Sequence, residues 1–308
     1  MDARSLSRFM APLLLAACHT ARSGEASNDA SVHRDTGAHL EDTGSGEDAR
    51  TIDGRAPHDA GQDATLCTGL FGNPNAHTGL TLAECSPSCA FDASTFAPPV
   101  YDAAFIQSLV DAWAPLSPSA PLTSDPYDGG TGDNDPPAMV CGVLPVADSG
   151  APRLYQLVTY ASAEAAAQAG AKVTHFGHCG VCSTLQNLSV YMGHNDLVAP
   201  VRACGEANLG SVDADVGCLE QLGFDLPCAQ AWAYDTRHTS AVCLSICFTR
   251  LSDPYNTPDG ALDPCLACDE DMSGPVFKEV AGRTRRNSGL ANAICRPCSE
   301  VQPLVHAY

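Results

Sequence analysis

Cysteine constrains this chain more than any other residue, because 16 of its 308 residues are cysteines and only 6% are aromatic. Cross-links can supply the stability that a small apolar core does not. Fifteen cysteines lie beyond Cys18, at positions 67, 85, 89, 141, 179, 182, 204, 218, 228, 243, 247, 265, 268, 295 and 298. In an oxidising compartment most of them should be paired, in a connectivity that sequence alone does not give. Because fifteen is odd, a modified Cys18 would leave at least one other cysteine as a free thiol, a metal ligand or an intermolecular bond.

The first 18 residues predict export. Arg4 and Arg8 precede nine mostly apolar residues, and Leu15-Ala16-Ala17-Cys18 ends this run. Nine apolar residues are too few for a membrane-spanning helix, which needs roughly 20. The pattern resembles the lipobox of bacterial lipoproteins, which implies cleavage before Cys18 and attachment of lipid to its thiol. The resemblance therefore implies a membrane partner and an extracytoplasmic place in the bacterial cell envelope, either facing the periplasm or on the cell surface.

Composition divides the rest of the chain into a tether and a domain. Residues 19–65 contain no Phe, Tyr, Trp or Cys and ten acidic residues, so they predict a disordered acidic tether. Residues 66–308 predict a cysteine-rich extracytoplasmic domain, with candidate subregions 66–150 and 151–308. This domain carries ten basic and 25 acidic residues, a formal charge of −15 that would repel a phosphate backbone. Nucleic acid is therefore not an expected partner.

The spacing of apolar residues predicts an α+β fold that is disulfide-rich and dominated by helices. A strand-helix-strand unit is expected from strands at 154–160 and 172–176 around a helix at 163–169, capped by Ser162 and ended by Gly170. Further helices are expected at 102–113, 183–192, 213–222, 227–237 and 239–251, with one more starting near Pro275. The segment 66–150 is otherwise predicted to be rich in loops. Cys218, Cys228, Cys243 and Cys247 are expected to link helices to their neighbours.

The candidate catalytic site is the turn between the second strand and the next helix, where Cys179 and Cys182 form a Cys-x-x-Cys pair beside His178. A helix N-terminus stabilises a thiolate, so Cys179 would be the nucleophile, Cys182 the resolving thiol and His178 the group that tunes the thiolate. Over roughly residues 154–192 this spacing resembles thioredoxin-type oxidoreductases, which implies thiol-disulfide exchange. His178 stands where that family usually has tryptophan, and we do not extend the resemblance to the whole fold. A structural disulfide is the alternative.

The same window offers a second chemistry, the binding of copper or zinc. His175, His178, Cys179, Cys182 and His194 place imidazole nitrogens and thiolate sulfurs within 20 residues of one another. If the strand continues through Phe176, however, His175 and Phe176 point to opposite faces. Histidines packed in the core or exposed on the surface are the alternative to a metal site.

The C-terminal segment suggests two more sites. Its four cysteines have the spacing Cys-x2-Cys-x26-Cys-x2-Cys, which fits a zinc ribbon in a reducing compartment and two disulfides in an oxidising one. We expect the disulfides. Basic residues concentrate between the two pairs and form a candidate anion site for a carboxylate or sulfate, at Lys278, Arg283, Arg285 and Arg286. Salt bridges to nearby acids such as Glu270 are the alternative.

These patterns favour a lipid-anchored, disulfide-rich binding or structural module. The alternatives are a thiol-disulfide oxidoreductase using Cys179 and Cys182, and a copper- or zinc-binding protein. The sequence has no Gly-rich phosphate loop, His-Glu-x-x-His helix or Gly-x-Ser-x-Gly elbow, so hydrolase and nucleotide-binding functions lose their main support. It leaves the ligand and the enzymatic status open.

Overall fold

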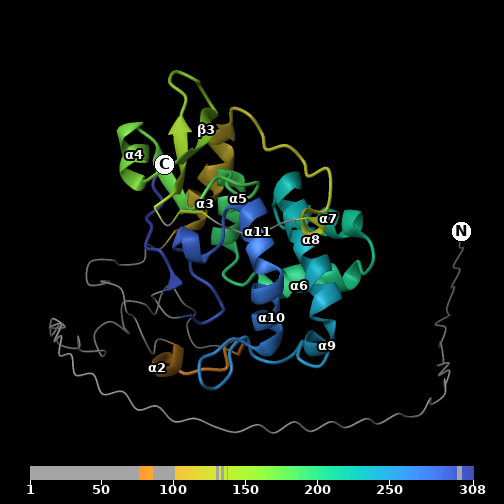
Figure 1. Ribbon diagram of the computed structural model, residues 1–308. Coiled ribbons are helices and arrows are strands. Elements are labelled where there is room, and N and C mark those ends of the chain that lie inside the picture. The colour runs from red at the N-terminus through yellow and green to blue at the C-terminus, as the bar shows by residue number, and fades with distance from the viewer. Residues whose placement is uncertain (1–75, 86–100, 130–131, 133–134, 137, 297–299) are drawn as a thin grey trace, which may run out of the picture. The chain divides into compact units, whose positions relative to one another are not determined.

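A computed structural model describes residues 76–85, 101–129, 132, 135–136, 138–296 and 300–308. The predicted signal segment, with Cys18, and the acidic tether lie outside these residues. The described chain is an α+β domain in which a small sheet packs beside a larger group of helices (Figure 1). This confirms the predicted fold class, including its richness in disulfides.

The sheet has four strands in the order β1-β3-β2-β4. The predicted strands are β3 (Arg153–Tyr160) and β4 (Lys172–Phe176), and they are not neighbours because β2 (Val140–Pro145) lies between them, antiparallel to both. β1 (Trp113–Pro115) pairs parallel with β3. The sequence did not predict β2, because Gly142 and Pro145 read as breakers. Gly142 is needed there, since a Cβ atom at this position would lie 2.8 Å from the ring of Tyr160.

Three helices lie close to the sheet, and each begins at a side-chain cap. Asp102 caps α3 (Ala103–Asp111), Ser162 caps α4 (Ala163–Gln168) and Thr184 caps α5 (Leu185–Gly193). The helix predicted at 102–113 ends earlier than expected because Trp113 joins β1. Gly170 follows α4 with a φ of 76°, as a helix-ending glycine requires.

The remaining helices form the larger layer, drawn toward the right in Figure 1. They are α6 (Val198–Ala207), α7 (Val212–Gln221), α8 (Leu226–Val242), α9 (Leu244–Cys247), α10 (Pro264–Met272) and α11 (Gly274–Ala281). The sequence divided α8 wrongly: the helix predicted at 239–251 consists of the end of α8 and the single turn of α9. It also missed α10, whose apolar residues do not gather on one face. Short turns of helix complete the chain: α2 (Leu82–Cys85), Pro126–Asp128 and Arg286–Ser288.

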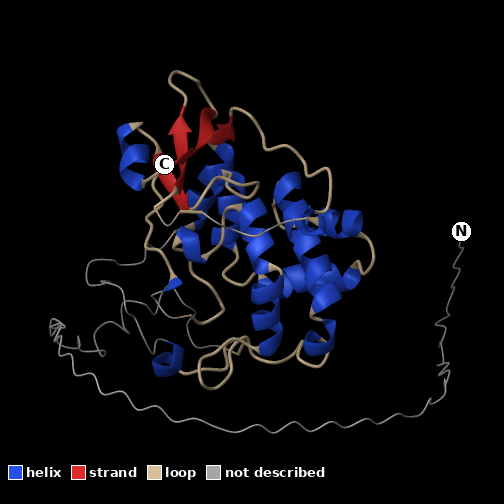
Figure 2. Cartoon of the chain, in the orientation of Figure 1, coloured by secondary structure: helices blue, strands red, loops and turns tan. Residues whose placement is uncertain are grey.

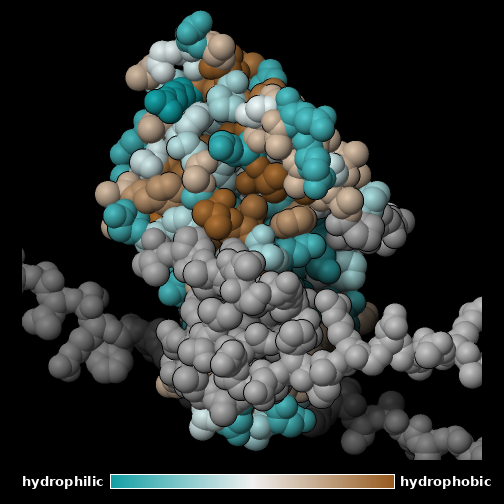
Figure 3. Space-filling model, turned by 90° about the vertical axis from the view of Figure 1, so that its left-hand side faces the viewer, coloured by the Kyte–Doolittle hydropathy of each residue, from teal (hydrophilic) through white to brown (hydrophobic). Residues whose placement is uncertain are grey.

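The main core contains buried side chains from β2 and β3 of the sheet and from α3, α5, α6, α7, α8 and α11. Figure 2 shows the red strands of the sheet beside the blue helices. α5 is central to it: Leu185 and Leu188 are fully buried and belong to the same cluster as buried residues of α3, α8 and α11. A smaller cluster joins Tyr255 and Leu266 to Ile294. On the face seen in Figure 3, hydrophobic residues gather at mid-height among hydrophilic ones. No helix in the described ranges is both long and apolar enough to cross a membrane.

Candidate functional site

The Cys-x-x-Cys turn lies where the sequence predicted it, between β4 and α5, but its two cysteines do not pair with each other. Cys179 is bonded to Cys141 on β2, and Cys182 is bonded to Cys228 on α8. Each cysteine therefore connects the turn to a different part of the fold. The hypothesis of a Cys179–Cys182 exchange pair is wrong, because neither thiol is available as nucleophile or resolving partner.

The histidines around this turn are engaged in the fold. His175 is fully buried, with Nε2 2.7 Å from Ser183 Oγ and Nδ1 2.9 Å from the Phe176 carbonyl oxygen. Burial, reinforced by the nearby Arg283 guanidinium, holds the pKa of His175 well below its ordinary value. His178 places Nδ1 2.6 Å from Asp135 Oδ2 and Nε2 2.6 Å from the Glu279 carbonyl oxygen. Neither ring has a nitrogen lone pair directed at a common metal position.

The predicted copper or zinc site is therefore wrong as well. Cys179 and Cys182 are disulfide-bonded and cannot act as thiolate ligands. His194 lies at the C-terminal end of α5, where its carbonyl oxygen accepts a hydrogen bond from Arg285. Among the described residues, no group of three His, Cys, Asp or Glu side chains is placed to hold a metal ion.

Two of the four residues of the candidate anion site donate their hydrogen bonds mainly to backbone carbonyl oxygens. Arg283 is fully buried, and its guanidinium donates to the carbonyl oxygens of Cys182, Thr174 and Ser183 and to the hydroxyls of Thr174 and Ser288. Arg285 is buried too and donates to the carbonyl oxygens of Tyr191, Ala291 and His194. Burial lowers the pKa of each arginine to about 10, which leaves both protonated at neutral pH. Arg283 cannot bind an external anion, because all its donors are directed into the fold.

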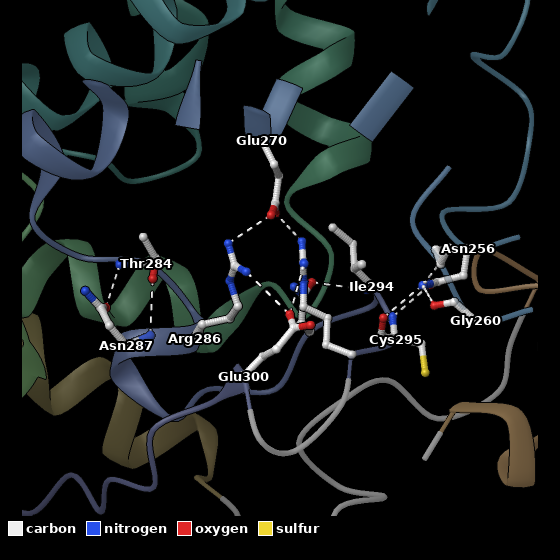
Figure 4. Close-up of polar contacts among 12 residues, drawn as sticks. Asn256, Gly260, Glu270, Thr284, Arg286, Asn287, Ile294, Cys295 and Glu300 are labelled. Carbon is white, nitrogen blue, oxygen red and sulfur yellow. Dashed lines mark hydrogen bonds and ion pairs between the residues drawn. The ribbon is translucent and has the colours of Figure 1, made fainter. Parts of the chain in front are cut away.

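Arg286 takes part in a network of four charges, drawn in Figure 4. It lies 2.9 Å from Glu270 Oε2 and 3.4 Å from Glu300 Oε2, and Arg296 contacts the same two carboxylates. The alternative of salt bridges within the segment is confirmed for Arg286. Of the four candidates, Lys278, Arg283 and Arg285 have no carboxylate within 4 Å among the described side chains, and Arg283 and Arg285 instead donate to the backbone.

The four C-terminal cysteines do not form a unit. Cys265 is bonded to Cys247 on α9, and Cys268 is bonded to Cys243 at the end of α8, so a zinc ribbon is ruled out. Cys204 on α6 is bonded to Cys218 on α7, which confirms that cysteines link helices to their neighbours. Cys295 is buried as a free thiol, with its sulfur 2.6 Å from the carbonyl oxygen of Cys85, the other unpaired cysteine among the described residues. Cys298 lies outside them.

The feature that sequence reasoning missed is an apolar cavity of about 490 Å³ enclosed by α6, α8, α9, α10 and α11. Its volume is within the range of small-molecule sites. The mouth carries apolar side chains that face solvent, with Leu209 78%, Phe248 72% and Leu244 59% exposed. Two disulfides brace the wall, since Cys247 and Cys265 line the cavity and Cys243–Cys268 joins the same helices. The lining residues range from Tyr191 to Arg296, so no local motif could reveal the site.

Two carboxyl groups lie on the wall of this cavity. Asp235 on α8 accepts a hydrogen bond from the Tyr127 hydroxyl at 2.7 Å, and Asp269 on α10 accepts one from the Thr239 hydroxyl. Burial, together with the charge of Asp269, holds the pKa of Asp235 well above its ordinary value. Burial likewise raises the pKa of Asp269 to about 6. Neither carboxyl has a basic side chain within 4 Å among the described residues, so neither is held in its charged form by a direct ion pair.

Three buried polar atoms of the lining have no hydrogen-bond partner among the described residues. They are the Tyr191 hydroxyl, the Trp232 indole nitrogen and Arg296 Nε. The indole nitrogen of Trp232 is close enough to lower the pKa of Tyr191, but the two groups do not reach hydrogen-bond geometry; burial is the larger effect and raises that pKa to about 12. All three groups are donors, and unpaired donors are costly to bury. No described residue supplies an acceptor at these positions.

Comparison with known proteins gives one match, to a family model described as "Family of unknown function (DUF8771)", over residues 212–304. This stretch begins with α7 and includes α8 to α11, and so it includes most of the cavity wall. No curated protein and no solved structure matches the chain.

Proposed function

We propose that this protein is a lipid-anchored extracytoplasmic binding module and that the cavity between α6, α8, α9, α10 and α11 is its ligand site. The five disulfides among the described residues indicate an oxidising, extracytoplasmic environment. The lipobox pattern supports attachment through a lipid on Cys18. The acidic tether would then separate the domain from the membrane surface.

The cavity is the observation that carries this proposal. Most of the exposed surface of its wall is apolar, and the polar residues of the lining include donors with no partner in the described chain. Such a combination of apolar walls and a few placed polar groups is typical of small-molecule sites. The bracing disulfides favour binding, because a wall that is already rigid loses little conformational entropy when a ligand is bound. A ligand with an apolar body fits this environment.

Displacement of a neutral apolar fluorophore tests the site. N-phenyl-1-naphthylamine should increase in fluorescence when it enters the cavity of the chain carrying Cys18→Ser, which needs no detergent. Ser240 lines the cavity and is exposed, so Ser240→Trp should block the entrance and remove at least nine-tenths of the signal. The matched control is Ala241→Trp, the next residue of α8, which is exposed and does not line the cavity. Equal fluorescence from the two variants would reject the cavity as the binding site.

The anchor is tested separately in the native exporting cell. A clickable fatty acid supplied during growth should label the wild-type protein and should not label Cys18→Ser. Recovery of Cys18→Ser in the soluble extracytoplasmic fraction is the accompanying result. Label on both proteins would reject lipidation at Cys18 without bearing on the cavity.

A further inference from the structure

One region of the cavity lining gathers hydrogen-bond donors and positive charge. Tyr191 and Trp232 lie in ring contact, with centroids 6.3 Å apart, and Trp232 packs on Phe277 at 4.6 Å. The Arg285 guanidinium lies over the Tyr191 ring, 5.6 Å from its centre. Lys278 follows Phe277 on α11. These five residues all line the cavity.

The unpaired groups here require an acceptor. The indole nitrogen of Trp232 and Arg296 Nε can each donate a hydrogen bond but cannot accept one. The Tyr191 hydroxyl has neither a donor nor an acceptor beside it in hydrogen-bond geometry. Tyr191 is only 2% exposed, so bulk water does not readily supply the missing partner. A protonated amine head group, which has no acceptor, would leave the indole and guanidinium N–H groups unsatisfied.

The charges of the lining favour an anion. Its cationic side chains are Arg202, Lys278, Arg285, Arg286 and Arg296, and its acidic side chains are Glu206, Asp235, Asp269 and Glu270. Glu270 is already held between Arg286 and Arg296, and the other three cations, Arg202, Lys278 and Arg285, have no carboxylate within 4 Å among the described residues. The raised pKa of Asp235 favours its neutral form and so reduces the negative charge that would oppose an anion. This balance contrasts with the formal charge of −15 over residues 66–308.

We infer that the ligand is an amphiphile with an oxyanion head, which accepts hydrogen bonds from Tyr191 and Trp232 beside Lys278, and with an apolar chain directed toward Leu244 and Phe248 at the mouth. The inference rests on the proposed function, because it names the ligand class of the same cavity. It also recovers part of the predicted anion site: Lys278 supplies charge at the head, while Arg283 plays no part.

Competition among three ten-carbon amphiphiles tests the head-group preference in the Cys18→Ser chain with N-phenyl-1-naphthylamine bound. Decanesulfonate stays anionic across the working pH range, decylamine is cationic and decanol is neutral. Decanesulfonate should displace the fluorophore at a concentration at least tenfold lower than decanol, and decylamine should be no better than decanol. Sodium sulfate at the same concentration should displace nothing, which separates an amphiphile from a free anion.

Two substitutions locate the head group. Lys278→Met and Tyr191→Phe should each weaken the binding of decanesulfonate about five- to tenfold and leave the binding of decanol unchanged. Lys172→Met removes a lysine from the distant strand β4 and serves as the control. Binding of all three amphiphiles with equal strength, or stronger binding of decylamine, would overturn the inference. If Ser240→Trp still abolished binding in that case, the cavity would remain the ligand site. Failure of the fluorophore and of every amphiphile to bind would instead reject the proposed function.

Discussion

The Cys-x-x-Cys turn and the cavity are opposites in how they use polar groups. The turn holds Cys179 and Cys182, which are bonded to β2 and α8, and His175 at the end of β4 is hydrogen-bonded to Ser183 in the turn. The cavity has a mostly apolar surface and no recognisable motif, yet Tyr191 and Trp232 keep polar atoms without a partner in the described chain. The difference shows that reactive residue types do not by themselves identify a site. What matters is whether their bonding capacity is already used within the fold.

The largest effect is expected on the turn side, from loss of the Arg283 clamp. Arg283→Leu would leave buried carbonyl and hydroxyl groups of β4 and the turn without donors, at a cost on the order of 4 kcal/mol in the free energy of unfolding. Arg286→Leu, which removes partly exposed salt bridges, should cost about 1 kcal/mol. Urea denaturation measures both. Similar losses in the two variants would contradict the view that Arg283 is the buried structural clamp.

Removing one disulfide from the turn and one from the cavity wall should have different effects on ligand binding. In the chain-entropy account, loss of Cys141–Cys179 by double alanine substitution costs about 4 kcal/mol and loss of Cys247–Cys265 about 3 kcal/mol, because the closed loops span 38 and 18 residues. Only the second pair lines the cavity, so only Cys247→Ala/Cys265→Ala should also weaken binding of the fluorophore. Equal loss of binding in both double variants would show that the turn and the cavity are coupled.

The raised pKa of Asp269 predicts a smaller, pH-dependent effect on the cavity side. Its pKa of about 6 in the folded chain lies above its ordinary 3.8, so the folded state binds the proton more tightly than the unfolded state. Stability should therefore fall as pH rises from about 4 to about 6, and the penalty should persist above pH 6. Asp269→Asn keeps an acceptor for Thr239 and removes this penalty. Relative to the wild-type chain, its free energy of unfolding should therefore be higher at pH 7 than at pH 4 by on the order of 1 to 3 kcal/mol.

Unfolding curves of the wild-type chain and Asp269→Asn, taken at pH 4 and pH 7, give this difference. Asp213→Asn, on the exposed side of α7, controls for the loss of one negative charge. A wild-type chain whose stability changes with pH in parallel with Asp269→Asn would show that Asp269 titrates as an ordinary carboxyl.

The smallest effect is expected from alkylation of cysteine thiols, because almost no cysteine of the folded protein should react. Among the described cysteines only Cys85 and Cys295 are free, and both are buried. Burial, together with the neighbouring Cys85, raises the pKa of the Cys295 thiol, which lowers its reactivity further. Iodoacetamide followed by peptide mapping should therefore label these two only after unfolding. Labelling of Cys179 in the native chain would restore the turn as a candidate redox site.

Local patterns predicted the part of the fold that depends on neighbouring residues. Ser162 and Gly170 bound α4 as expected, because a cap and a left-handed glycine act within one turn of helix. β2 was missed, because its burial between β3 and β4 outweighs the weak strand preference of Gly142 and Pro145. α10 was missed for a similar reason: Cys265 and Cys268 bond to α9 and the end of α8, so cross-links rather than an apolar face hold it in place.

The sequence by itself determined that the chain is α+β, that cysteines hold it together and that a strand-to-helix turn carries Cys179 and Cys182. Only the tertiary structure decided the partners of those cysteines, the burial of Arg283 and the placement of Lys278, Trp232 and Tyr191 on the lining of one cavity. The physical reason is the distance along the chain over which each interaction acts. Caps and periodicity act over a few residues, whereas a disulfide or a cavity wall depends on which distant segments pack together.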